Sequence, residues 1–225
     1  MKARAILTAV TALTALTVTL LCASPTGAQT DAALKPVQLK KPDLTRKAPL
    51  MEALSKRMST REFGAKKLAD QELADLLWAG NGINRPDKGG RTAPSAHNAQ
   101  DIDIYAVLPE GAYLYDAKKN ELTPVAAGDH RPVIAPQQAF VATAPVNLIL
   151  VSDYSRLPGG ANGAGTASIA AIDAGIVSQN ISLFCAAVGL VTVPRAMIDN
   201  DKTAAALKLK PTQKILLNHP VGYPK

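Results

Sequence analysis

Two short polar segments contain the side chains best suited to chemistry. In the first, from Lys56 to Phe63, two cations and two hydroxyl groups lie within five residues: Arg57, Ser59, Thr60 and Arg61. A guanidinium group offers paired donors to anionic oxygens, and a hydroxyl group adds a neutral donor. The segment therefore suits a phosphate monoester. Taken alone, it also has the composition of a solvated helix end whose arginines complement the helix dipole.

The second segment runs from Arg91 to Gln100 and is small, polar and rich in amides. Ser95, Asn98 and Gln100 could approach a ring closely and hydrogen-bond its heteroatoms. Loops are polar for other reasons as well, so this segment by itself identifies no ligand.

Other kinds of reaction find little support in the sequence. No set of His, Cys or carboxylate residues has the spacing of metal ligands, so no metal site is predicted. Neither Ser59 nor Ser95 has a base arranged with it, which argues against a hydrolase triad. Cys185 stands in an apolar helical stretch with nothing nearby to stabilise a thiolate, so we predict a buried structural role. No catalytic side chain is therefore predicted.

Helices and strands around these segments indicate an α+β domain with helices packed against one sheet. Apolar residues recur at helical spacing from Leu50 to Met58 and after Asp70. Alternation predicts a strand over Asp101 to Leu108, the first of a small antiparallel meander. The other predicted elements are strands at 112–115 and 122–125, a short helix at 136–143, strands at 146–151 and 190–193, a helix at 201–209 and a strand at 214–218.

One predicted helix is much longer than the rest. Thr166 to Val188 carries small and aliphatic residues on most faces, and about 23 residues of helix measure roughly 34 Å. Asp173, Gln179 and Asn180 interrupt it, and a membrane span tolerates such groups poorly. We therefore predict a central core or dimer-interface helix, buried nearly all round, and no permanent membrane span.

The N-terminus has the pattern of a signal peptide at residues 1–28, with Lys2 and Arg4 ahead of an apolar run and a small-residue cleavage site ending at Ala28. Cleavage would lower the formal charge from +7 to +5 and place the protein in the periplasm or outside the cell. Lipidation at Cys22 is the alternative. Residues 29–48 are polar, lack an apolar period and predict a flexible linker ahead of a domain at 49–225.

Together, in this order and spacing, the two polar segments resemble two elements of the nitroreductase family. Arg57-Met58-Ser59-Thr60-Arg61 is similar to its Arg-x-Ser-x-Arg/Lys element, and Pro94-Ser95-Ala96-His97-Asn98-Ala99-Gln100 is similar to its Pro-Ser-x-x-Asn-x-Gln element. The likeness extends from about Leu50 to the C-terminus. The stretch Arg91 to Ser95 also resembles the branch of the family that oxidises azoline rings in modified peptides.

The resemblance implies a nitroreductase-like mixed sheet flanked by helices, with a long central helix, in a homodimer that has flavin sites at its interface. The first element would hold the FMN phosphate and ribityl chain through Arg57, Ser59 and Arg61, with backbone contacts from Met58. The second element would reach the same flavin from the partner subunit, and its implied contacts are Pro94, Ser95, Asn98 and Gln100. Backbone amides at Ala196 and Met197 would lie against the flavin's N5 and O4 edge, and Lys225 is the one residue available as the family's C-terminal cation.

The implied activity is that of an exported FMN-dependent oxidoreductase that passes hydride or electrons through flavin N5 in two steps. A small-molecule donor would reduce the flavin, and a small organic acceptor such as a nitro or quinone compound would reoxidise it. The alternative is a catalytically idle secreted protein that binds a flavin or another aromatic anion. No nucleic-acid partner is expected, because Lys and Arg are spread along the chain rather than clustered with aromatic residues.

Overall fold

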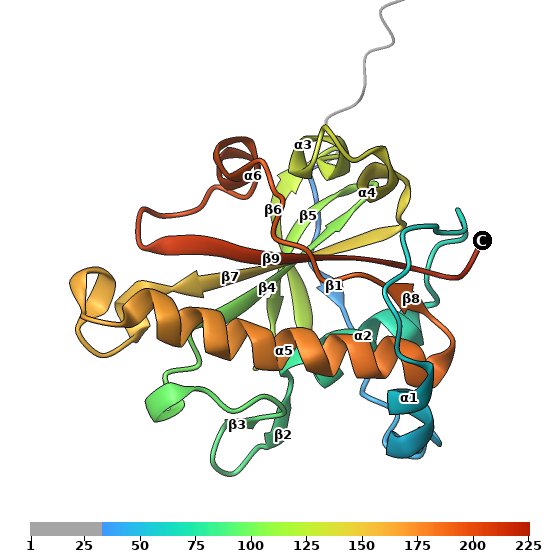
Figure 1. Ribbon diagram of the computed structural model, residues 1–225, viewed down its shortest axis with the longest axis horizontal. Coiled ribbons are helices and arrows are strands. Elements are labelled where there is room, and N and C mark those ends of the chain that lie inside the picture. Colours follow the sequence, from blue (N-terminus) through green and yellow to red (C-terminus); the bar gives the residue numbers. More distant parts are fainter. Residues whose placement is uncertain (1–32) are drawn as a thin grey trace, which may run out of the picture. The chain divides into compact units, whose positions relative to one another are not determined.

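The computed structural model describes residues 33–225, so the predicted signal peptide, the cleavage site at Ala28 and the Cys22 alternative lie outside the described residues. A seven-stranded sheet forms the centre, in the order β1-β6-β5-β4-β7-β9-β8, and its strands pair antiparallel (Figure 1). Its strands are β1 (Val37–Gln38), β4 (Ile102–Leu108), β5 (Gly111–Asp116), β6 (Glu121–Ala127), β7 (Val146–Asp153), β8 (Val191–Thr192) and β9 (Gln213–Gly222).

The interior strand β7 is mainly apolar on both faces because a layer of helices covers each face. Leu148 and Leu150 pack with α2 (Asp70–Asn81) and α5 (Thr166–Val188) in one core cluster. Ile149 points to the opposite face, since side chains alternate along a strand, and packs in a second cluster beneath three short helices. These are α3 (Arg131–Ile134), α4 (Ala139–Thr143) and α6 (Asn200–Ala206).

Helix α5 has the predicted bounds, and glycines in the left-handed region flank it at Gly165 (φ 82°) and Gly189 (φ 79°). Its length and composition would suit a membrane span, yet it packs against α1 (Leu50–Lys56), α2 and the sheet. The prediction that it is buried nearly all round does not hold within one chain. A face of small and aliphatic residues is open to solvent, and Ile172 on that face is 63% exposed.

The folded unit begins at residue 33, earlier than the predicted Pro49. The part of the predicted linker that the structure describes is extended, but it is attached to the domain. Strand β1 pairs with β6, and Arg46 forms an ion pair with Asp75 of α2 at 2.8 Å. A two-residue edge strand and a polar ion pair leave no apolar period in the sequence, which is why the segment resembles a free linker.

Two further differences from the predicted elements have local causes. The helix predicted at 136–143 is limited to α4 at Ala139–Thr143, and α3 precedes it unpredicted; the two stay separate because Pro136 disfavours helical backbone at the residue before it. A small hairpin of β2 (Ile83–Arg85) and β3 (Gly90–Arg91) was not predicted, since its strands are too short to show alternation.

Candidate functional site

The first polar segment leaves the end of α1 and runs beside β8. Ser59 forms a parallel bridge with Thr192, and the Thr60 N–H donates to the Thr192 carbonyl at 3.0 Å. Farther along, the Gly64 N–H donates to the Tyr223 carbonyl at 2.9 Å. These contacts bring the end of α1, strand β8 and the C-terminal residues to one region of the molecule.

The cations of this region are exposed and uncommitted. Arg57, Arg61 and Lys225 are all exposed, and none of them forms an ion pair within residues 33–225. Their neighbour Lys56, by contrast, pairs with Glu52 at 2.5 Å. Met58 and Ser59 are exposed as well. The donor set of two guanidinium groups, a hydroxyl group and an ammonium group therefore fits a phosphate monoester without breaking any internal ion pair.

A pocket of about 190 Å³ adjoins the segment between α5 and β8. Its lining comprises Lys56, Met58, Thr60, Ser182, Cys185, Ala186, Gly189, Leu190, Val191 and Thr192. Burial raises the pKa of the Cys185 thiol, so the sulfur is neutral and has the structural role predicted for it. Burial also lowers the pKa of His219 to about 3, and this neutral ring is held between Ser178 and Thr192.

The segment after β8 exposes both residues that the sequence predicts at the flavin edge. Ala196 and Met197 are exposed, and their backbone N–H groups donate to no group within residues 33–225. The nearest committed N–H groups on either side are those of Arg195, which donates to Asn218 at 3.0 Å, and Asp199, which donates to Ile134 at 2.8 Å; the half-buried Ile198 between them also donates to no group within residues 33–225. Two neighbouring exposed residues, Ala196 and Met197, thus have free backbone donors.

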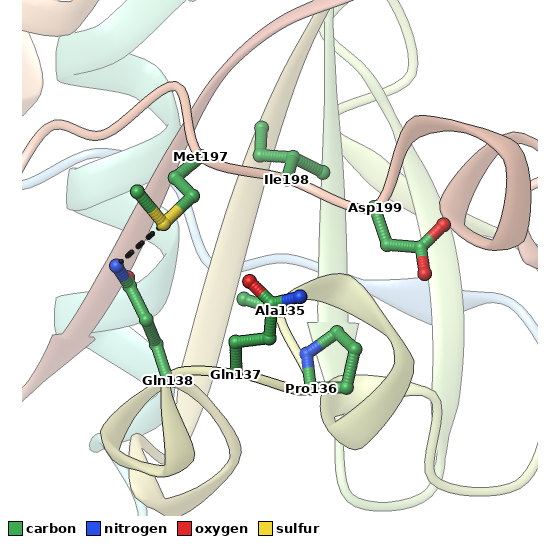
Figure 2. Close-up of a pocket in the computed structure, with 7 residues that line it drawn as sticks. All are labelled: Ala135, Pro136, Gln137, Gln138, Met197, Ile198 and Asp199. Atoms are coloured by element: carbon green, nitrogen blue, oxygen red, sulfur yellow. Dashed lines mark hydrogen bonds between the residues drawn. The ribbon is translucent and has the colours of Figure 1, made fainter.

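Met197 also borders a second pocket, of about 170 Å³ (Figure 2). One wall comes from the link between α3 and α4, and the other from the residues that lead into α6. Gln138 and Met197 reach toward each other across it, with the amide nitrogen of Gln138 at 3.0 Å from the sulfur. The lining residues are Ala135, Pro136, Gln137, Gln138, Met197, Ile198 and Asp199.

The second polar segment has an unusual backbone. His97 and Asn98 in the 3₁₀ turn Ala96–Asn98 both have φ of 53°, and Gln100 has φ of 49°. Left-handed backbone is rare outside glycine and recurs at functional sites. The Ala96 N–H anchors the turn by donating to the Asp173 carboxylate of α5 at 3.0 Å.

The side chains of this segment divide into exposed and committed groups. Pro94 and Asn98 are exposed, whereas Ser95 and Gln100 are half-buried. The Ser95 hydroxyl accepts from the Gln100 N–H at 2.8 Å. The Gln100 side-chain amide accepts from Arg91 and donates to the Gly89 carbonyl, each at 3.0 Å. Gln100 also donates to the Asn98 side-chain oxygen at 3.3 Å, so it braces the segment in this chain and leaves only the side-chain NH₂ group of Asn98 uncommitted.

Beneath the segment lies a pair of buried carboxyl groups that the sequence did not indicate. Asp101 and Asp173 are 0% and 3% exposed. One Asp101 oxygen accepts from Ser152 at 2.5 Å, and the other has no partner within the described residues. Burial and the adjacent Asp173 carboxylate raise the pKa of Asp101 to about 6, although the Ser152 hydrogen bond opposes them.

Arg195 is another residue that sequence reasoning missed. It is only 9% exposed, and it donates to Gln138, to Asn218 and to the Met197 carbonyl. Burial lowers the pKa of the guanidinium, which stays protonated all the same. A single arginine after a short strand gives no sequence signal of burial.

The two polar segments lie along different parts of α5 (Figure 1). Ser182 borders the pocket beside the first segment, and Asp173 anchors the second. Nine residues of helix separate these positions, about 14 Å along the axis at about 1.5 Å per residue. One chain therefore brings Arg57, Ser59 and Arg61 close to β8, but does not bring Asn98 to them.

Comparison with known proteins identifies the family of this chain. The family model described as the nitroreductase family matches residues 54–223. A nitroreductase homologue of Methanocaldococcus jannaschii is 28% identical over 195 residues, which cover 83% of this chain and 96% of that protein. The crystal structure of a nitroreductase homologue from Ralstonia eutropha JMP134 superposes with a TM-score of 0.80 at 34% identity, covering 86% of this chain and 91% of the other.

A more distant structure, NfrA2 of B. megaterium, is 22% identical, covers 78% of this chain and 66% of its own, and has a TM-score of 0.59, so it shows a shared fold. The predicted α+β fold with its long helix is confirmed by these likenesses. The family model covers most of the folded unit, including both polar segments and β8. The chain therefore belongs to the nitroreductase family, oxidoreductases whose members typically use a flavin.

Proposed function

We propose that this protein is an exported FMN-dependent oxidoreductase that works as a homodimer. The observation that carries the proposal is the set of uncommitted donors at the end of α1, beside two free backbone N–H groups after β8. Bound FMN would supply the redox chemistry, taking hydride or electrons from a donor and passing them to a small organic acceptor, such as a nitro or quinone compound, in two steps.

Residues of this chain would bind and orient the cofactor. Arg57 and Arg61 would pair with its phosphate, with Ser59 as a neutral donor and the Met58 backbone alongside. Lys225 would add a third cation. The free N–H groups of Ala196 and Met197 would donate to the electron-accepting edge of the ring, where fixed dipoles favour added negative charge.

A second copy of the chain would complete the site. Asn98 and Pro94 are exposed but lie too far along α5 to join Arg57 in one chain. The open face of α5 continues into a groove of about 380 Å³ between α1, α2 and α5. Large apolar side chains are exposed on α1, just after it and on α5 (Leu50, Met51, Leu54, Met58 and Ile172). Exposed apolar patches of this kind mark protein interfaces, so we place the dimer contact here.

The proposed export rests on the sequence pattern at residues 1–28. It limits the electron donors that could reach the protein. Nicotinamide donors are scarce outside the cytoplasm, so we propose a membrane quinol or a small thiol as the donor. The small pocket beside Met197, with amide and apolar walls, is the proposed place for part of the donor or acceptor.

The test is FMN binding by the purified mature protein, followed by its visible spectrum, with Arg57→Ala and a matched Lys56→Ala variant. Lys56 is already paired with Glu52, so its loss should change affinity little. Loss of Arg57 should weaken binding about 10- to 150-fold, because a hydrogen bond to a charged group contributes about 1.5–3 kcal/mol. A wild-type protein that does not bind added FMN would contradict the proposal.

A further inference from the structure

Arg195 is a buried cation whose hydrogen-bond partners are all neutral. Its Nε donates to the Gln138 side-chain oxygen at 2.9 Å, one terminal nitrogen donates to the Asn218 side-chain oxygen at 2.8 Å, and the other donates to the Met197 carbonyl. No carboxylate pairs with it within residues 33–225. Its full positive charge therefore stays uncompensated.

This arrangement is costly for folding, because a charge taken out of water is destabilising unless an opposite charge or good hydrogen bonds offset it. Here a network of amides provides the hydrogen bonds. Asn218 donates to the Asn147 side chain at 3.1 Å, and Asn147 donates to the Val141 carbonyl at 2.8 Å. Amides can hold a guanidinium group in place, but they leave its charge available to a neighbouring group.

The charge lies directly beside the two free backbone donors. Arg195 precedes Ala196, and its hydrogen bond to the Met197 carbonyl fixes the peptide that follows them. Gln138 links the same guanidinium group to the Met197 sulfur at the mouth of the pocket in Figure 2. A single buried side chain thus both orients this segment and gives it a positive potential.

We infer that Arg195 is a positioning residue that raises the reduction potential of a flavin bound against Ala196 and Met197. This inference rests on the proposed flavin site. A flavin gains negative charge on reduction, and a fixed cation attracts that charge more strongly at low dielectric than the same cation would in water. Arg195 would therefore make the bound flavin a better electron acceptor, which suits a weakly reducing donor such as a quinol.

The experiment measures the midpoint potential of bound FMN against a reference dye. The key variant is Gln138→Glu, which keeps Arg195 and its acceptor at Nε but places a carboxylate there. The carboxylate would offset the positive charge of the guanidinium and should lower the equilibrium constant for flavin reduction at least tenfold. For a two-electron couple this is a fall of about 30 mV in the midpoint potential. Arg195→Gln should shift the potential in the same direction, and Arg195→Lys should shift it less because the charge remains.

Lys202→Gln is the matched control, since it removes an exposed cation of α6 that is paired with Asp199 at 3.0 Å and leaves Arg195 and its hydrogen bonds unchanged, so the potential should hold. If Arg195→Gln fails to fold, Gln138→Glu decides alone. Variants that bind FMN at the wild-type potential would overturn the inference and leave Arg195 a purely structural tie, with the proposed function intact. A wild-type protein that takes up no FMN would overturn both.

Discussion

Charged side chains in this protein have two opposite environments. Arg57 and Arg61 are exposed, without ion pairs in the described part of the chain. Arg195 and Asp101 are buried beside neutral or like-charged neighbours. The two exposed arginines can bind an anionic ligand without breaking an internal ion pair. The two buried groups each make folding less favourable, and stability measurements should detect this cost.

The pH dependence of stability should reveal two opposing groups. The folded pKa of Asp101, about 6, lies above its usual 3.8, so its contribution to stability is complete below pH 3.8 and is lost as the pH rises to 6. Burial lowers the pKa of His219 from 6.5 to about 3, so its contribution is complete above pH 6.5 and is lost as the pH falls. Each group changes the free energy of unfolding by about 1.4 kcal/mol per pH unit, Asp101 downward and His219 upward as the pH rises, so the two contributions nearly cancel between pH 4 and 6.

Replacing Asp101 with asparagine should leave the pH dependence of stability that is due to His219 unopposed. The free energy of unfolding of Asp101→Asn, relative to wild type, should rise by about 1.4 kcal/mol per pH unit from pH 4 to pH 6. Urea titrations at three pH values measure this difference, and groups common to both proteins drop out of it. A constant difference would show that Asp101 is ionised throughout this range.

The buried charged residues could not be predicted from the sequence, whereas the exposed ones could. Arg57, Ser59 and Arg61 could be predicted as a site because their chemistry is dense over a few positions. Arg195 and Asp101 owe their character to burial and to partners more than twenty residues away, such as Asn218 and Ser152. Neither feature leaves a local pattern.

Among the elements, α5 sets the geometry of the site. It separates the two polar segments by about 14 Å and carries the groups that border each of them. Its bounds could be predicted because a long stretch of mainly small and aliphatic residues lies between Gly165 and Gly189. The β2-β3 hairpin and the attachment of β1 could not, because elements of two or three residues are held by tertiary pairing rather than by a pattern.

The end of α5 offers a direct test of its capping. Gly189 has φ of 79°, and a Cβ there would meet nothing within 4 Å, so any cost of substitution is a backbone cost. Gly189→Ala should destabilise the fold by about 1–2 kcal/mol, since left-handed backbone disfavours a Cβ. Gly189→Asn is the matched control and should lose less, because asparagine tolerates this region. Equal thermal stability of all three proteins would contradict the capping role.

An apolar surface on α1 and α5 is exposed to solvent in a single chain. If the open face of α5 is the dimer contact, Ile172→Glu should weaken dimerisation about 100-fold or more, because a carboxylate would be buried without a partner at a cost of about 3 kcal/mol or more. Sedimentation velocity over a range of concentrations measures the effect. Val37→Glu, on the distant edge strand β1, is the matched apolar-to-acid control and should leave the dimer intact. Equal effects of both would argue for a different contact surface.

The central claim is that each flavin site combines Arg57 of one chain with Asn98 of its partner. Arg57→Ala and Asn98→Asp should each abolish most FMN binding in homodimers, and aspartate keeps the size and backbone tolerance of Asn98. Heterodimers of the two variant chains, purified through different tags, contain one intact site and one doubly altered site.

The decisive measurement is therefore the FMN content of those heterodimers at a fixed FMN concentration. Recovery to about one FMN per dimer, against almost none in either variant homodimer, is the predicted result. Heterodimers as empty as the homodimers would mean that both residues act within one chain, and would contradict the account.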